Sequence, residues 1–152
     1  MTLKIGDKAP DFTLLSDKEE SISLKALRGK KVVLFFYPKD NTPGCTREAC
    51  DFRDQINVFE KKGVEVFGIS KDSAASHTKF KNKHSLPFTL LVDDNADVCE
   101  AYDVVSQKSM FGKTFLGITR STFLINEKGM IENIWRKVKV TGHVEQILNE
   151  LN

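Results

Sequence analysis

The feature that most constrains this chain is an apolar strand that leads through a proline–glycine turn into a helix bearing two cysteines. Residues 31–37 are β-branched and aromatic with almost no polar interruption, which is typical of a central strand buried on both faces. Pro38 ends this run, and Pro43 and Gly44 mark the turn. The sequence therefore predicts a strand, a turn and a helix, with the cysteines on the helix.

Cys45 occupies the first turn of the expected helix. Beyond it, apolar residues recur every three to four positions, as on one helix face, at Ala49, Phe52, Ile56 and Phe59. Free backbone N–H groups and the positive end of the helix dipole favour an anion there, so this thiol should ionise more readily than an ordinary cysteine. The pattern describes a nucleophilic thiolate. The alternative is a buried, inert cysteine, which is the usual state of a lone cysteine.

Cys50 lies five positions after Cys45, and helix geometry restricts what this pair can do. On an unbroken helix their Cα atoms would be roughly 8.6 Å apart and about 140° apart around the axis. A disulfide requires about 7 Å or less and converging side chains. If the two cysteines bond, the first turns of the helix must unwind, which makes the pair a switch between a folded and a locally unfolded form. The alternative is a cysteine packed on the helix face near Phe52.

The remainder of the chain alternates between strand and helix patterns. We expect a hairpin over residues 12–15 and 21–24, strands at 64–70 and 88–92, helices at 73–84 and 93–102, a second hairpin over 121–125 and 130–135, and a helix over 141–151. The strand at 88–92 should be short or at an edge, and residues 106–117 should form a loop. This order predicts an α/β fold, with right-handed crossovers and a central mixed sheet flanked by helices on both faces.

Composition limits the classes of function. The chain has 152 residues, enough for a single domain spanning 1–152, and its net charge of +2 with scattered lysines argues against a nucleic-acid partner. The first residues lack the apolar segment of a secretion signal, and no stretch is long enough for a membrane span. A cytoplasmic location is thus the default expectation. The three cysteines are more typical of catalysis or metal binding than of a structural framework, and their spacing, like that of the histidines, fits no metal site.

Several motifs resemble those of one family. Pro38, Thr42 and Cys45 have the spacing of the peroxiredoxin active-site motif, and residues 42–50 resemble the Q branch, the bacterioferritin comigratory proteins. Residues 6–12 and 117–125 also look like that family, so the similarity spans nearly the whole chain. Together with the N-terminal β-hairpin expected from the strand pattern, the resemblance implies a thioredoxin-like fold, which periodicity alone would not distinguish from other α/β folds.

The resemblance also implies roles for individual residues. Cys45 would be the peroxidatic residue, becoming a sulfenic acid, and Cys50 the resolving residue that converts it to an intramolecular disulfide. Thr42 would hydrogen-bond the peroxide and the thiolate, and Pro38 would shield the thiolate from water. Arg120 would lie over the thiolate and stabilise the departing oxygen. From the sequence alone, these three would be read as a helix cap, a strand terminator and a solvated surface residue.

Three further residues are of secondary interest. Arg47 and Glu48 are close to Cys45 on spacing alone; Arg47 would either lower the pKa of the thiol or form a surface ion pair. Cys99 matches no catalytic motif and is expected to be a core residue.

The resulting interpretation is a thiol peroxidase that reduces hydrogen peroxide and small organic hydroperoxides. Sulfur would supply the redox chemistry without haem, flavin or metal, and thioredoxin or a similar dithiol protein would recycle the disulfide. An internal resolving cysteine removes the chemical need for a partner subunit and favours a monomer. One rival is a redox-switched binding protein that exposes Phe52 and Phe59 when its helix unwinds. A second is a disulfide reductase, which normally has a two-residue gap between its cysteines.

Overall fold

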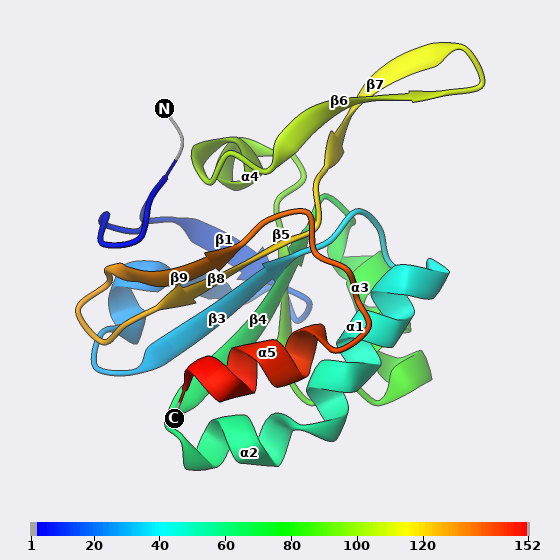
Figure 1. The fold of residues 1–152 in the computed structure, drawn as a ribbon. Helices are drawn as coiled ribbons and strands as arrows, with labels where there is room; N and C mark the ends of the chain where they lie inside the picture. Colours follow the sequence, from blue (N-terminus) through cyan, green and yellow to red (C-terminus); the bar gives the residue numbers. More distant parts are fainter. Residues whose placement is uncertain (1–2, 152) are drawn as a thin grey trace.

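The computed structural model describes residues 3–151 (Figure 1). In chain order the strands are β1 Thr13–Ser16, β2 Ser21–Ser23, β3 Lys31–Phe36, β4 Val64–Ser70, β5 Thr89–Val92, β6 Val105–Met110, β7 Lys113–Ile118, β8 Ser121–Ile125 and β9 Ile131–Trp135. The helices are the 3-10 turn η1 Leu24–Leu27 and the α-helices α1 Pro43–Asp54, α2 Ile56–Lys61, α3 Ala74–His84, α4 Asp97–Ala101 and α5 His143–Glu150.

Seven of the strands form one mixed sheet in the order β2-β1-β5-β4-β3-β8-β9. The three inner strands β3, β4 and β5 are parallel, whereas β8 runs antiparallel to β3 and β1 runs antiparallel to β5. The expected mixed sheet and N-terminal hairpin are thus confirmed. Of the two alternatives for the strand at 88–92, the structure shows a short strand and not an edge strand, because the hairpin β1–β2 joins the sheet beside β5.

Hydrophobic residues cover both faces of the sheet. On one face, the odd-numbered side chains of β3 pack with buried residues of α1, α2, α3 and α5. On the other face, the even-numbered side chains of β3 pack with η1, α4 and the N-terminal segment. Because β3 is buried on both faces, it reads in the sequence as a continuous apolar run rather than an alternating one.

The helix that carries the cysteines is shorter than its apolar pattern indicates. The pattern at 49–59 predicts one helix, but the chain breaks at Gln55, where φ is −111° and ψ is 8°. The apolar face continues across the break: Phe52 on α1 and Phe59 on α2 are both fully buried and their ring centroids are 5.8 Å apart. The apolar residues therefore form one continuous buried face, although the backbone changes direction at Gln55.

The expectation of a loop at 106–117 is wrong. Strands β6 and β7 pair in a separate antiparallel hairpin that extends away from the body of the molecule (Figure 1). Its two-residue turn has Phe111 at φ 53° and Gly112 at φ 76°, which is the primed geometry that matches strand twist. The sequence obscures this hairpin because β6 is largely polar, the apolar residues of β7 do not alternate regularly, and a phenylalanine occupies a turn position usually taken by Asn or Asp.

The parallel strands bring their carboxyl ends to one edge of the sheet, and this edge organises the candidate site. The segments after β3 and β4 begin there, at Tyr37 and Lys71. Strand β8 starts at the same edge, because it is antiparallel to β3 and its first residue, Ser121, pairs with Phe36. Residues just before β8 are thereby placed beside residues that follow β3.

Within residues 3–151, no helix combines the length and the apolar character needed to cross a membrane.

Candidate active site

Cys45 lies in the first turn of α1, immediately behind the turn that follows β3. Its side chain is buried, with 1% exposure, and it packs in the core cluster that contains Phe35 and Phe52. The first helical hydrogen bond joins the N–H of Thr46 to the carbonyl of Thr42 at 2.9 Å. The N–H groups of Gly44 and Cys45 precede that bond, so the positive end of the helix faces this region, as the sequence predicts.

Arg120 is brought to Cys45 from the far end of the chain. Its Nη2 donates to Cys45 Sγ at 3.3 Å, and its backbone carbonyl accepts from the N–H of Val138 at 3.0 Å. It precedes β8 rather than beginning it, so the pairing of Phe36 with Ser121 determines where the guanidinium lies. The expected position of Arg120 over the sulfur agrees with this geometry.

Glu48 holds the other side of the same guanidinium. Arg120 Nη1 donates to Glu48 Oε1 at 2.7 Å, and Glu48 is only 1% exposed. Burial raises the pKa of Glu48 from 4.5 to about 7, against the opposing effect of the Arg120 charge. In the described part of the chain, Oε2 of Glu48 has no hydrogen-bond partner. The sequence placed Glu48 near Cys45 but gave no sign that it orients Arg120.

Gly44 permits the close approach of Arg120 to α1. A Cβ at this position would lie 3.1 Å from Arg120 Nη2, closer than ordinary van der Waals contact. The glycine of the turn therefore has a steric role in the site, in addition to its place before the cysteine. This role depends on a neighbour that is remote in sequence.

Thr42 occupies the N-cap position of α1 but does not cap the helix with its side chain. Its hydroxyl instead donates to the carbonyl of Lys39 at 2.9 Å. With its proton engaged in this way, the oxygen presents lone pairs that can accept a hydrogen bond. Pro38 lies in the same turn with an exposed side chain.

Cys50 and Arg47 lie farther along α1. Cys45 and Cys50 are both free thiols, and Cys50 is partly buried. Both belong to the uninterrupted helix Pro43–Asp54, so the geometric barrier to a disulfide that the sequence predicts applies here. Of the two alternatives for Arg47, the structure favours the surface ion pair, because its Nε lies 4.0 Å from Asp51 Oδ2 and its side chain is 61% exposed.

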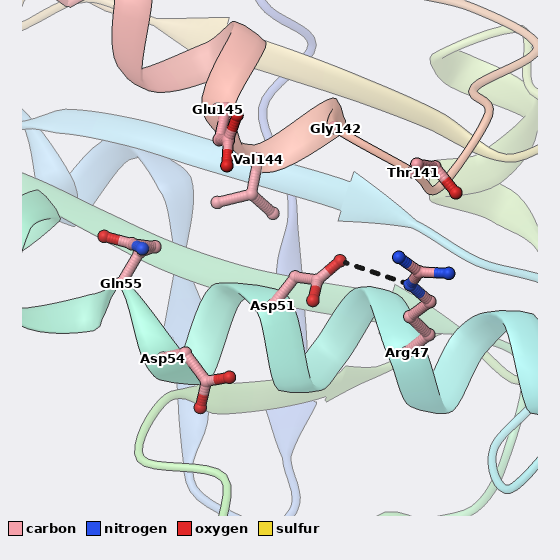
Figure 2. Close-up of a pocket in the computed structure, with 8 residues that line it drawn as sticks. All are labelled: Arg47, Asp51, Asp54, Gln55, Thr141, Gly142, Val144 and Glu145. Atoms are coloured by element: carbon pink, nitrogen blue, oxygen red, sulfur yellow. Dashed lines mark ion pairs between the residues drawn. The ribbon is translucent and has the colours of Figure 1, made fainter.

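A cavity of about 350 Å³ lies between α1 and the start of α5 (Figure 2). Its lining residues are Arg47, Asp51, Asp54, Gln55, Thr141, Gly142, Val144 and Glu145. Cys45 is not among them, so this cavity is separate from the thiol.

A buried polar network lies under the turn and was not foreseen from the sequence. Asp40 accepts hydrogen bonds from the Tyr37 hydroxyl at 2.6 Å and from Ser76 at 2.8 Å, and its Oδ2 is 2.8 Å from His77 Nδ1. Burial alone lowers the pKa of His77, but the Asp40 carboxylate and the Leu91 carbonyl together raise it above 6.5. The sequence indicates only that His77 lies on a helix face and that its spacing from the cysteines and the other histidines fits no metal site.

Among the described residues, one group of side chains is arranged so that it could hold a metal ion. This group consists of Asp40, Asp72 and His77. One ligand atom from each lies within 4.8 Å of the others. Each of these atoms already has a hydrogen-bond partner inside the protein, and His77 Nε2 lies 2.9 Å from the Leu91 carbonyl. Hydrogen bonds within the protein therefore hold each of these atoms in position.

Cys99 is fully buried on the opposite side of the sheet from Cys45, in the core cluster with Val98 and Tyr102. Burial raises its pKa, and the neighbouring Asp93 carboxylate adds to the rise. The expectation that Cys99 is a core residue is confirmed.

The arrangement around Cys45 suits a thiolate that attacks an electrophile and releases an anion. A guanidinium supplies positive charge next to the sulfur, and a buried carboxyl group holds that guanidinium in place. The Thr42 oxygen supplies an acceptor in the adjacent turn. Such a set can bind a small molecule that carries one proton to donate and one oxygen that leaves with negative charge.

Comparison with known proteins identifies the family. The AhpC/TSA family model matches residues 5–134. The chain is 55% identical over 151 residues to the putative peroxiredoxin bcp of Coxiella burnetii, which covers 99% of this chain and 100% of the relative. It is 52% identical over 151 residues to peroxiredoxin Bcp of Bacillus subtilis, with 99% and 96% coverage.

Comparison with solved structures indicates the same family. A structure of the bacterioferritin comigratory protein of Xanthomonas campestris superposes with a TM-score of 0.88 at 41% identity, covering 92% of this chain and 89% of that chain. The thioredoxin-like fold expected from the resemblance is thereby confirmed, and so is the enzyme class. The chain belongs to the AhpC/TSA family and is a thiol peroxidase of the peroxiredoxin type, with bacterioferritin comigratory proteins among its relatives.

Proposed function

We propose that Cys45 is the peroxidatic residue and that the surrounding groups act on the two oxygens of a hydroperoxide. The Cys45 thiolate attacks one oxygen, the O–O bond breaks, and the other oxygen leaves with the electron pair as hydroxide or alkoxide. Cys45 becomes a sulfenic acid, and the departing oxygen takes a proton to give water or an alcohol. The observation that carries this assignment is the hydrogen bond between Arg120 Nη2 and Cys45 Sγ.

Arg120 and Thr42 interact with different parts of the peroxide. The guanidinium of Arg120 stabilises negative charge first on the sulfur and then on the leaving oxygen, while Glu48 keeps its plane oriented. The hydroxyl proton of Thr42 is directed at Lys39, so its oxygen accepts a hydrogen bond from the O–H of the hydroperoxide. Pro38, in the same turn, limits the access of water to the sulfur.

Cys50 resolves the sulfenic acid. Its thiol attacks the sulfur of the Cys45 sulfenic acid, a disulfide forms, and water is released. Because α1 is continuous between the two residues, this step requires the first turns of the helix to unwind. The unwinding should stop before Phe52, because the ring of Phe52 stacks on that of Phe35 with their centroids 4.5 Å apart.

A dithiol protein of the thioredoxin class then restores the enzyme. Its two thiols reduce the Cys45–Cys50 disulfide by exchange and become a disulfide themselves, which places the cycle in a reducing compartment such as the cytoplasm. The substrates are hydrogen peroxide and organic hydroperoxides; alkyl peroxide reduction is the activity described for the Xanthomonas campestris relative. An internal resolving cysteine lets a monomer complete the cycle.

Intact mass measurement after addition of one equivalent of hydrogen peroxide to the reduced protein tests these assignments. The expected product is a loss of two hydrogens, mapped by peptide analysis to Cys45 and Cys50. The Cys45→Ser variant should consume no peroxide, whereas Cys99→Ser, a matched control outside the site, should behave as the wild type. Peroxide turnover by Cys45→Ser would overturn the assignment of Cys45, and a crosslink between two chains would overturn that of Cys50.

A further inference from the structure

The peptide group that joins Lys39 to Asp40 is held at both ends. Its carbonyl, on Lys39, accepts the hydrogen bond of the Thr42 hydroxyl at 2.9 Å. Its N–H, on Asp40, donates to Asp72 Oδ2 at 2.8 Å. A single planar unit thus connects the hydroxyl in the active-site turn with a carboxylate on the segment between β4 and α3.

Asp72 is itself fixed to the central sheet. Ser70, the last residue of β4, is fully buried and donates its hydroxyl to Asp72 Oδ2 at 2.7 Å. The N–H of Asp72 donates back to Ser70 Oγ at 3.2 Å. The carboxylate therefore has a defined position relative to β4, which is hydrogen-bonded along its length to β3.

The side chain of Asp40 prevents the same peptide group from rotating. This carboxylate accepts from the hydroxyls of Tyr37 and Ser76 and contacts His77 Nδ1 at 2.8 Å, in a site where Asp40 is 5% exposed. A flip of the Lys39–Asp40 peptide would displace both the N–H bonded to Asp72 and the carbonyl bonded to Thr42. Only one orientation satisfies these contacts together.

We infer that Asp72 is a positioning residue for peroxide reduction, which acts on Thr42 through the Lys39–Asp40 peptide. The Asp72 charge attracts the peptide N–H and polarises the peptide, so that the Lys39 carbonyl becomes a stronger acceptor for the Thr42 hydroxyl proton. That proton is then kept away from the substrate, and the lone pairs of Thr42 Oγ1 face the hydroperoxide O–H. This inference rests on the role proposed above for Thr42.

A double-mutant cycle tests the inference. The rate constant for the reaction of reduced protein with hydrogen peroxide is measured for the wild type, Asp72→Ala, Thr42→Val and the double variant. We expect Asp72→Ala to slow the reaction about tenfold when Thr42 is present and less than about twofold in the Thr42→Val background, since a residue that acts through Thr42 has nothing left to position. Asp72→Asn keeps the acceptor oxygen but removes the charge, and should slow the reaction about threefold.

Two controls separate positioning from general damage to the protein. Alkylation of Cys45 by iodoacetamide does not use an O–H acceptor, so its rate should be the same in Asp72→Asn as in the wild type. Asp94→Asn changes an exposed carboxylate outside the network and should leave both reactions unchanged. Circular dichroism establishes that each variant is folded, and Asp72→Asn supplies the comparison if Asp72→Ala does not fold.

The outcomes distinguish the inference from the function on which it rests. If Thr42→Val reacts as fast as the wild type, the role proposed for Thr42 is wrong and the inference is wrong with it. If Thr42→Val is slow but an Asp72 variant loses the same factor in both backgrounds, the Thr42 role stands and the inference is overturned. A parallel loss of the iodoacetamide rate in Asp72→Asn would also overturn it.

Discussion

Arg120 reaches Cys45 across 75 residues of sequence, with Nη2 3.3 Å from Sγ. The contact depends on strand pairing, because Arg120 precedes the residue of β8 that pairs with the last residue of β3. Arg120 lies in the two-residue connection between β7 and β8, and the pairing of Ser121 with Phe36 fixes the end of that connection. The charge of Arg120 is also partly shielded from water, since its side chain is 16% exposed.

Replacement of Arg120 by Met should lower the rate constant for peroxide reduction by roughly a hundredfold, because it removes the donor aimed at the sulfur and the leaving oxygen. Stopped-flow measurement on the reduced protein checks this. Arg47→Met, on the exposed side of α1, is the matched control and should change the rate by less than about twofold. Equal losses in the two variants would show that net charge, rather than the contact with Cys45, governs the reaction.

Glu48 makes the stability of the fold depend on pH. Its pKa is raised to about 7 in the folded protein and returns to 4.5 on unfolding, so the folded state binds the proton more tightly. The contribution to stability is fully present below pH 4.5 and is lost as the pH rises through about 7. Relative to Glu48→Gln, the wild type should lose up to about 3 kcal/mol across that window.

Urea denaturation of the wild type and Glu48→Gln from pH 4.5 to 8 measures this difference. Taking the difference between the two proteins cancels the titration of other groups. A constant gap over the whole range would show that Glu48 is ionised throughout and that its ion pair with Arg120 outweighs its burial.

The buried pair of His77 and Asp40 also makes stability fall as the pH rises, but in a window that begins at a higher pH than that of Glu48. Because the pKa of His77 is raised above 6.5, its contribution is fully present below pH 6.5 and is lost as the pH rises through the folded value. His77→Gln should cost about 3 kcal/mol at pH 6, and the deficit should shrink at higher pH. Thermal unfolding at pH 6 and pH 9 checks this. A deficit that grows with pH would contradict the raised pKa of His77 in the folded protein.

Gly44→Ala tests whether the guanidinium is held tightly. The backbone at Gly44 is helical, so alanine is favoured locally, but its Cβ would lie 3.1 Å from Arg120 Nη2. We expect a displaced Arg120 and a peroxide rate lowered by about three- to tenfold, with stability unchanged or slightly increased. An undiminished rate would mean that Arg120 shifts without consequence for the reaction.

Oxidation should unwind the first turns of α1. A Cys45–Cys50 disulfide is incompatible with the continuous helix Pro43–Asp54, so circular dichroism at 222 nm should lose the signal of roughly two helical turns. Cys50→Ser, which forms no intramolecular disulfide with Cys45, should keep its helical signal after the same treatment. An unchanged spectrum in the fully disulfide-bonded wild type would contradict the geometric argument.

Local patterns in the sequence were sufficient to predict much of the secondary structure. The apolar run of β3, the Pro-Gly turn and the cysteine spacing predicted the strand–turn–helix unit, because each depends on neighbours within one or two turns of chain. Local patterns failed at Gln55, where a helix breaks without Gly or Pro, and at β6–β7, whose strands lack a regular alternation of apolar and polar residues.

The sequence by itself determined which chemistry is present: a thiol at a helix start, a second thiol on the same helix, and a turn with a hydroxyl beside them. Tertiary structure alone decided how that chemistry is controlled. Parallel strands end at one edge of the sheet, so β-pairing brings Arg120 to Cys45 and sets Asp72 against the peptide that directs Thr42. Burial then makes Glu48 the partner of that arginine. These relationships join residues far apart in the chain, so local spacing does not encode them, and only the resemblance of residues 117–125 to a family motif indicated the place of Arg120.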